Sequence, residues 1–343
     1  MNKDDVLKKD KESLDDIIKM IDTHRNNAYR KVNEELVTLY YKVGKYLSIK
    51  VKNERWGTKV IENIAKGIKE MYPTLKGFDR IGLYRMVKFY ETYKDNEIVS
   101  TLLTQIGWAN NLIIITGTKS IEEREFYIRM CIKNKYSARE LKRQISSGYY
   151  FRYMLSKDSN NVLESTDKTI DEDDIPQTKI LDYYSLEFLD LPNNFSEKDL
   201  RKALVSNLKD FILELGSDFS FIGEEYRVQV GNHDYYIDLL FYNRTHNCLV
   251  AIELKIDEFK PEYLSKMNFY LEALDRNIKK ENENPSVGII LCASKDDVVV
   301  EYTLARNSSP TTVAEYNIDI IDKKILENKL KELKNEFEYT KSA

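Results

Sequence analysis

The stretches DYYIDLLFYN (residues 234–243) and LVAIELK (residues 249–255) contain the pattern that decides the fold of this chain. Both are rich in β-branched, aromatic and aliphatic residues, and the segment between them is turn-like, which predicts two adjacent antiparallel strands. Because side chains alternate between the two faces of a strand, Glu253 and Lys255 lie on one face of the second strand, and Asp238 lies on the neighbouring first strand. Two carboxylates and an ammonium can hold a divalent cation and stabilise charge on a phosphodiester. A plain salt bridge between Glu253 and Lys255 explains the spacing equally well.

The flanking segments predict an α/β domain around these two strands. The predicted elements are a helix from Ser196 to about Leu215, strands at 219–223 and 226–230, a helix at 261–276, a buried strand at 287–292, a helix at 296–305, an edge strand at 311–316 and a charged helix from Lys323. This order indicates a mixed sheet flanked by helices.

The first part of the chain predicts helices only. Apolar spacing predicts one helix or two over residues 13–50, followed by helices at 60–72, 78–90 and 105–115, and capping motifs at Ser120 and Ser137 begin two more. The predicted organisation is a helical domain at 1–155, a polar and acidic linker at 156–178, and an α/β domain at 179–343.

Charge separates the two halves of the chain. The net charge is -4, but residues 1–150 hold 29 Lys and Arg against 20 Asp and Glu, whereas the remainder holds 24 against 37. A basic first half fits a nucleic-acid-contacting module, although ordinary variation between helical surfaces is a serious competitor. The candidate nucleic-acid-binding residues are Arg80, Arg85 and Lys88, on a segment resembling a helix-turn-helix, and Arg139, Lys142 and Arg143. Bundle helices with solvated basic residues explain this segment about as well.

Aromatic residues gather around Arg152, at positions 149, 150, 151 and 153. In such a cluster the basic side chain can bind backbone phosphates and the aromatic rings can stack on exposed bases. The commoner explanation is that the rings pack into the helical core while the arginine faces outward.

The composition excludes several other classes of protein. The three cysteines, Cys131, Cys248 and Cys292, are widely spaced in apolar contexts, which indicates buried thiols in a reducing cytoplasm, without a disulfide framework or a zinc site. The charged N-terminus and the short apolar runs predict neither a signal peptide nor a membrane span.

Several longer stretches extend the pattern over nearly the whole chain. In the second half these are YYIDLLFY (235–242), IELK (252–255), FKPEY (259–263), MNFY (267–270) and GIILC (288–292); in the first half they are VN (32–33), LY (39–40), Gly44, WG (56–57), KGF (76–78) and EREFY (123–127). Together they resemble the YhcG-type nuclease family of the PD-(D/E)xK superfamily, with its helical N-terminal domain. The resemblance implies a two-domain α+β protein whose second domain is a restriction-endonuclease-like α/β domain with a mixed central sheet.

The resemblance also assigns roles to residues. Asp238 and Glu253 would be metal ligands, with the main-chain carbonyl of Leu254 completing the shell around Mg²⁺ or Mn²⁺. Lys255 would position the attacking water or stabilise the phosphate, and Glu214 would be an auxiliary acid. Lys266 stands where many relatives carry Gln, so a catalytic role there is in doubt. The superfamily's proline before the first acid is absent, since Ile237 occupies that position.

The function that follows is a Mg²⁺-dependent DNA endonuclease hydrolysing phosphodiester bonds by metal-activated water, in DNA repair and recombination or in restriction and defence. A homodimer is expected because cutting both strands of a duplex needs two active centres. A partner protein from a restriction or defence system is also expected in that setting. No membrane partner is expected. The alternatives are a non-cleaving DNA-binding or complex-assembly protein that retains the nuclease fold, and an RNA-directed nuclease.

Overall fold

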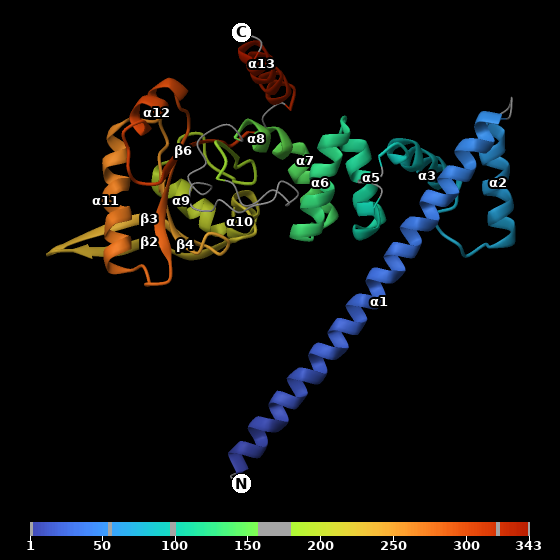
Figure 1. The fold of residues 1–343 in the computed structure, drawn as a ribbon, viewed down its shortest axis with the longest axis horizontal. Coiled ribbons are helices and arrows are strands. Elements are labelled where there is room, and N and C mark those ends of the chain that lie inside the picture. Colours follow the sequence, from blue (N-terminus) through green and yellow to red (C-terminus); the bar gives the residue numbers. More distant parts are fainter. Residues whose placement is uncertain (1–2, 54–56, 97–100, 157–179, 320–322, 342–343) are drawn as a thin grey trace. The chain divides into compact units, whose positions relative to one another are not determined.

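The computed structural model describes residues 3–53, 57–96, 101–156, 180–319 and 323–341. The chain divides into two compact units, Met1–Arg143 and Gln144–Ala343. Each unit is described by itself, and both are drawn in Figure 1.

The first unit is built from helices, as the sequence predicts. Its elements are α1 (Lys3–Asn53), α2 (Gly57–Met71), α3 (Arg80–Tyr93), the 3-10 turn η1 (Leu103–Gln105), α5 (Trp108–Gly117), α6 (Ile121–Asn134) and the start of α7 (Ala138–Ser146). The α1, α2 and α3 helices share a core that contains Tyr40, Leu47, Ile61, Leu83 and Met86. The Asp79 side chain accepts a hydrogen bond from Gly82 N at 2.7 Å and so caps the start of α3.

The α1 helix is continuous, which settles the choice between one helix and two. From Asn33 onward it packs into the unit: the Asn33 amide donates to the carbonyls of Thr104 and Ile106 at 2.9 and 3.1 Å. Before Asn33, every described side chain from Leu14 to Val32 is exposed.

The second unit contains a six-stranded mixed sheet in the order β1-β6-β5-β4-β3-β2. The strands are β1 (Tyr183–Ser185), β2 (Phe219–Val230), β3 (His233–Asn243), β4 (Cys248–Leu254), β5 (Asn284–Cys292) and β6 (Thr311–Asn317). Strands β2, β3 and β4 pair antiparallel, whereas β4, β5, β6 and β1 pair parallel. The helices are α8 (Tyr149–Leu155), α9 (Glu197–Ser206), α10 (Leu208–Leu215), α11 (Glu262–Asn277), α12 (Asp297–Leu304) and α13 (Lys323–Lys341). The mixed sheet and the helix at each predicted position confirm the expected fold class.

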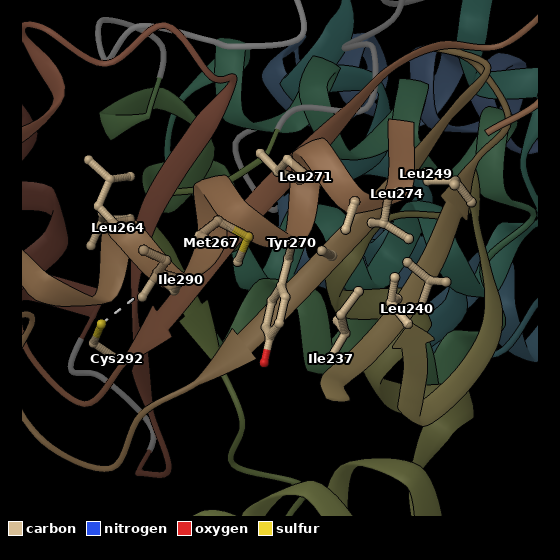
Figure 2. Packing of buried hydrophobic residues seen from close by; sticks show 14 of the residues in the cluster. Ile237, Leu240, Leu249, Leu264, Met267, Tyr270, Leu271, Leu274, Ile290 and Cys292 are labelled. Atoms are coloured by element: carbon tan, nitrogen blue, oxygen red, sulfur yellow. Dashed lines mark hydrogen bonds between the residues drawn. The ribbon is translucent and has the colours of Figure 1, made fainter. Parts of the chain in front are cut away.

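The core of this unit lies between α11 and the sheet. Figure 2 shows Met267 and Tyr270 of α11 among Ile237, Leu240 and Ile290 of the strands. The helix approaches β5 closely because Gly288 has no side chain: a Cβ there would lie 2.6 Å from Cγ of Met267. Burial of this continuous apolar cluster stabilises the sheet on which the candidate site lies.

Four details of the sequence-based prediction were wrong or incomplete. The strand at Thr311–Asn317 is not an edge strand, because the short strand β1 pairs beyond it. The helix expected from Ser196 to Leu215 is broken at Asn207, whose side chain bonds Ala203 O. The two strands expected over 219–230 form one strand with an irregularity between Phe221 and Gly223. The helix α8 belongs to the second unit, and Arg152 is buried within it rather than facing outward.

The predicted linker at 156–178 lies outside the described residues apart from Ser156.

Candidate active site

The candidate site forms where the pairing of β3 and β4 ends. The last paired residues are Leu239 and Ile252, so Asp238 and Glu253 come directly after the ladder. Asp238 Oδ2 accepts a hydrogen bond from Leu254 N at 3.0 Å. This carboxylate therefore satisfies a backbone donor that strand pairing would otherwise occupy, and it is held at the end of β4.

The Glu253 carboxylate is almost fully buried, with 1% of its side chain exposed. Its Oε1 accepts from Lys255 Nζ at 3.0 Å and from Lys266 Nζ at 2.5 Å. Its Oε2 is buried and has no hydrogen-bond partner among the residues that the structure describes. Burial and repulsion from Asp238 raise the pKa of Glu253, even though both lysines oppose that shift.

The Lys255 ammonium is held by three acceptors. Its Nζ donates to Glu253 Oε1 and Glu197 Oε1 at 3.0 Å each and to Leu254 O at 2.9 Å. Burial lowers the pKa of Lys255, but the Glu253 and Glu197 carboxylates outweigh burial and raise it above its usual range. The ammonium is therefore charged at neutral pH and points at the carboxylates, as the strand alternation predicts.

Helix α9 brings two further side chains to this place that sequence reasoning did not identify. Glu197 binds Lys255, and Arg201, one turn later, donates through Nη1 to Asp238 Oδ1 at 3.2 Å. Arg201 also binds Glu225 at 2.6 Å, and only 9% of its side chain is exposed. The available signal was the capping box at Ser196 followed by an acid and a base four residues apart, which places both on one face of the helix.

The donor chemistry of this site fits a hard divalent cation. Among the described residues, no group of three or more His, Cys, Asp or Glu side chains is placed to hold a metal. The expected set is smaller, since it combines two carboxylates with the Leu254 carbonyl. Oxygen ligands of this kind suit Mg²⁺ or Mn²⁺, and the unpartnered Glu253 Oε2 is a buried acceptor that such an ion would satisfy.

Glu214 lies in a different set of contacts. It is fully buried on α10, forms an ion pair with the Arg152 guanidinium, and accepts from Ser185 N at 2.8 Å. Arg152 also donates to the carbonyls of Ser147 and Tyr183 at 3.1 Å each. These contacts connect α8, β1 and α10, which favours a structural use of the Glu214 carboxylate; its catalytic role stays a prediction.

Most of the predicted nucleic-acid-binding residues are exposed in the first unit. Arg85, Lys88, Arg139 and Lys142 are exposed, and Arg143 is half-buried. Arg80 is exposed and forms an ion pair with Glu62 at 3.2 Å. Their role in binding stays a prediction.

Two further observations concern the chain as a whole. The three cysteines are free, buried thiols. Within the described residues, no helix combines the length and the apolar character needed to cross a bilayer.

Comparison with known proteins gives matches over both units. Residues 177–333 match the family model described as YhcG PDDEXK nuclease domain, and residues 16–152 match the DUF1016 N-terminal domain. The Escherichia coli (strain K12) protein named "Putative nuclease YhcG" is 29% identical over 351 residues, covering 92% of each chain.

Two solved structures also match part of the chain. A repair endonuclease from Pyrococcus abyssi is 19% identical over 37% of this chain and 50% of its own, with a TM-score of 0.25. EndoMS in its apo form is 16% identical over 36% of this chain and 48% of its own, also with a TM-score of 0.25. This chain thus spans about half the length of those two proteins, and the TM-scores are too low for a residue-by-residue comparison.

Proposed function

Because the chain belongs to the YhcG-type nuclease family, with a YhcG PDDEXK nuclease domain after a DUF1016 N-terminal domain, we propose that it is a divalent-metal-dependent DNA endonuclease. The family membership and the restriction-endonuclease-like class of the second domain agree with the sequence-based prediction. The metal, the substrate and the residues in their roles are the proposal.

The observation that carries the proposal is the arrangement of Asp238, Glu253 and Lys255 at the end of the β3–β4 ladder. A buried carboxylate with an unpartnered oxygen beside a second carboxylate is energetically costly, and the Lys255 ammonium offsets this cost only in part. A divalent cation between the two carboxylates would remove the cost of their repulsion.

Each residue has a proposed role. Asp238, Glu253 and the Leu254 carbonyl would hold Mg²⁺ or Mn²⁺, which acidifies water and offsets negative charge on a phosphodiester when it is bound. Lys255, held by Glu253 and Glu197, would donate to a non-bridging phosphate oxygen and stabilise the charge that develops there. Arg201 fixes the orientation of Asp238 by donating a hydrogen bond to Oδ1 of that carboxylate.

The helical N-terminal domain is proposed to bind the DNA backbone. Arg85, Lys88, Arg139 and Lys142 are exposed there, and phosphate contacts of this kind give affinity without sequence selectivity. The proposed organisation is the one predicted from the sequence, a DNA-binding domain at 1–155, a linker at 156–178 and a nuclease domain at 179–343, except that α8 packs with the nuclease domain. The setting is DNA repair and recombination, or restriction and defence with a partner protein.

The test is a cleavage assay with purified full-length protein. Linear, nicked, branched and single-stranded DNA, with RNA in parallel, are incubated with Mg²⁺, Mn²⁺ or EDTA. We expect cleavage of DNA that requires the metal and is lost in Glu253→Gln. The matched control is Glu258→Gln, an exposed acid on the loop after the site, which should cleave as the wild type does.

Other outcomes of this assay would point elsewhere. Cleavage by Glu253→Gln at the wild-type rate would contradict the assigned site. RNA cleavage alone would favour the RNA-directed alternative. Absence of cleavage of any substrate, with DNA binding retained in a parallel filter-binding assay, would favour the non-cleaving DNA-binding protein.

A further inference from the structure

The N-terminal half of α1 carries an apolar stripe that no described residue of the chain covers. Leu14, Ile18, Ile21 and Val32 are 56%, 46%, 50% and 66% exposed. With Arg25 and Ala28 they occupy positions 14, 18, 21, 25, 28 and 32. Alternate steps of four and three residues keep these positions on one face of an α-helix.

This stripe is not the face by which α1 packs into its own unit. Farther along the helix Val37 and Tyr40 are buried, whereas Leu36 and Leu39, which continue the stripe, remain 38% and 43% exposed. Figure 1 shows the N-terminal part of α1 running clear of α2 and α3. A solitary helix in water is marginally stable, and most helical stability in proteins comes from packing of an amphipathic face.

The residue positions of the stripe are symmetric about Thr23. Reversal of the positions about Thr23 maps 14 onto 32, 18 onto 28 and 21 onto 25. A second copy of α1 lying antiparallel would therefore place Leu14 against Val32, and Ile21 against the stem of Arg25. A surface that is complementary to itself in this way suits a two-fold symmetric contact.

Charge favours the antiparallel orientation over the parallel one. The described charged side chains are Asp16, Lys19 and Asp22 in the first half and Arg25, Arg30 and Lys31 in the second. Antiparallel pairing sets the acidic half of one helix beside the basic half of the other and brings Asp22 near Arg25. Parallel pairing would instead place two Arg25 side chains together in the middle of the apolar stripe.

We propose that α1 pairs antiparallel with α1 of a second copy of this chain, through the stripe centred near Thr23. The pairing joins two copies whatever reaction the second unit performs, so its failure and the failure of the nuclease proposal are distinguishable. If both hold, the dimer supplies the two active centres that duplex cutting needs.

Sedimentation equilibrium of the full chain tests the surface. We expect a dimer for the wild type and a monomer for Ile18→Glu/Ile21→Glu, because two carboxylates would interrupt the stripe of each helix. The matched control, Met20→Glu, changes a residue that is 62% exposed but lies on another face, and it should remain dimeric. Equal helix content by circular dichroism shows that the variants fold. A monomeric wild type, or a double variant that dimerises as well as the control, overturns the proposal.

Disulfide trapping tests the orientation. Two full-length variants, Ile18→Cys and Ala28→Cys, carry different tags and are mixed under oxidising conditions. Antiparallel pairing predicts cross-links between the two variants and few within either. The native cysteines are buried and should not compete. Cross-links that join Ile18→Cys to itself would show parallel pairing and overturn the proposed arrangement.

Discussion

Loss of the Arg152 side chain should destabilise the second unit strongly, and Arg152→Met is the perturbation that isolates this effect. Arg152 is fully buried and ion-paired to an equally buried Glu214. Methionine fills much of the space but leaves the carboxylate without its cation. Removing one partner of a buried ion pair costs about 3–5 kcal/mol.

Neighbouring groups add to this cost. The carbonyls of Ser147 and Tyr183 would each lose a charged donor at 3.1 Å, which adds about 1 kcal/mol apiece. The expected loss is therefore about 5 kcal/mol or more, a large fraction of the 5–15 kcal/mol that typical domains have.

Urea unfolding followed by circular dichroism measures the loss, and a second variant shows where it comes from. Arg152→Met/Glu214→Gln should recover about 2–3 kcal/mol, because the amide carries no charge and its oxygen still accepts from Ser185 N. The control is Arg227→Met, which breaks an exposed ion pair with Asp234 and should change stability by less than about 1 kcal/mol.

The single variant Glu214→Gln, together with Arg152→Met, tests the role of Glu214. If the carboxylate is structural, Glu214→Gln protein that remains folded should cleave DNA at close to the wild-type rate. A single Arg152→Met variant that loses less than about 1 kcal/mol would refute the electrostatic reasoning. A hundredfold loss of cleavage in a fully stable Glu214→Gln variant would instead support the auxiliary acid predicted from the sequence.

Three further predictions concern the candidate site. Lys255→Met should lower the cleavage rate by about 10²–10³-fold with DNA affinity unchanged in a filter-binding assay; an equal loss of affinity would contradict its role in the reaction. Because the pKa of Glu253 is raised, protons should compete with the metal for this carboxylate, and Mn²⁺ affinity measured by calorimetry should fall as the pH is lowered toward and below that raised pKa. Asp238→Asn should abolish Mn²⁺ binding. A pH-independent affinity would argue against Glu253 as a ligand. Lys266→Gln should strengthen Mn²⁺ binding, because it removes a cation 2.5 Å from Glu253, whereas the control Lys260→Gln should not; weaker binding in Lys266→Gln would show that the ammonium helps to build the site.

Local patterns in the sequence were sufficient to predict the central part of the second unit. Asp238, Glu253 and Lys255 lie on or next to adjacent strands joined by a short turn, so alternation and strand pairing bring them together without long-range information. The helices that follow were predictable for the same reason, since apolar spacing and capping residues act over a few residues.

Contacts made between distant segments were not predictable. Glu197 and Arg201 reach the site from α9, and only the packing of that helix against the sheet shows which acids and bases it presents. Arg152 lies in a cluster of aromatic residues and looked like a surface arginine, because its partner Glu214 is 62 residues away. The strand β1 has three residues, too few for a period to be detected.

The absence of a side chain at Gly288 has a consequence for the charge carried by the neighbouring turn of α11. Met267 occupies the space that a Cβ at Gly288 would need, and this contact fixes the rotation of the helix about its own axis. Lys266, the preceding residue, then reaches Glu253 with its ammonium, although about half of its side chain stays exposed. A methyl group added at Gly288 would press on the Met267 side chain. Any turn or lift of the helix that relieves this contact would carry the ammonium away, so steric fit inside the core bears on the electrostatic environment of the carboxylates beside it.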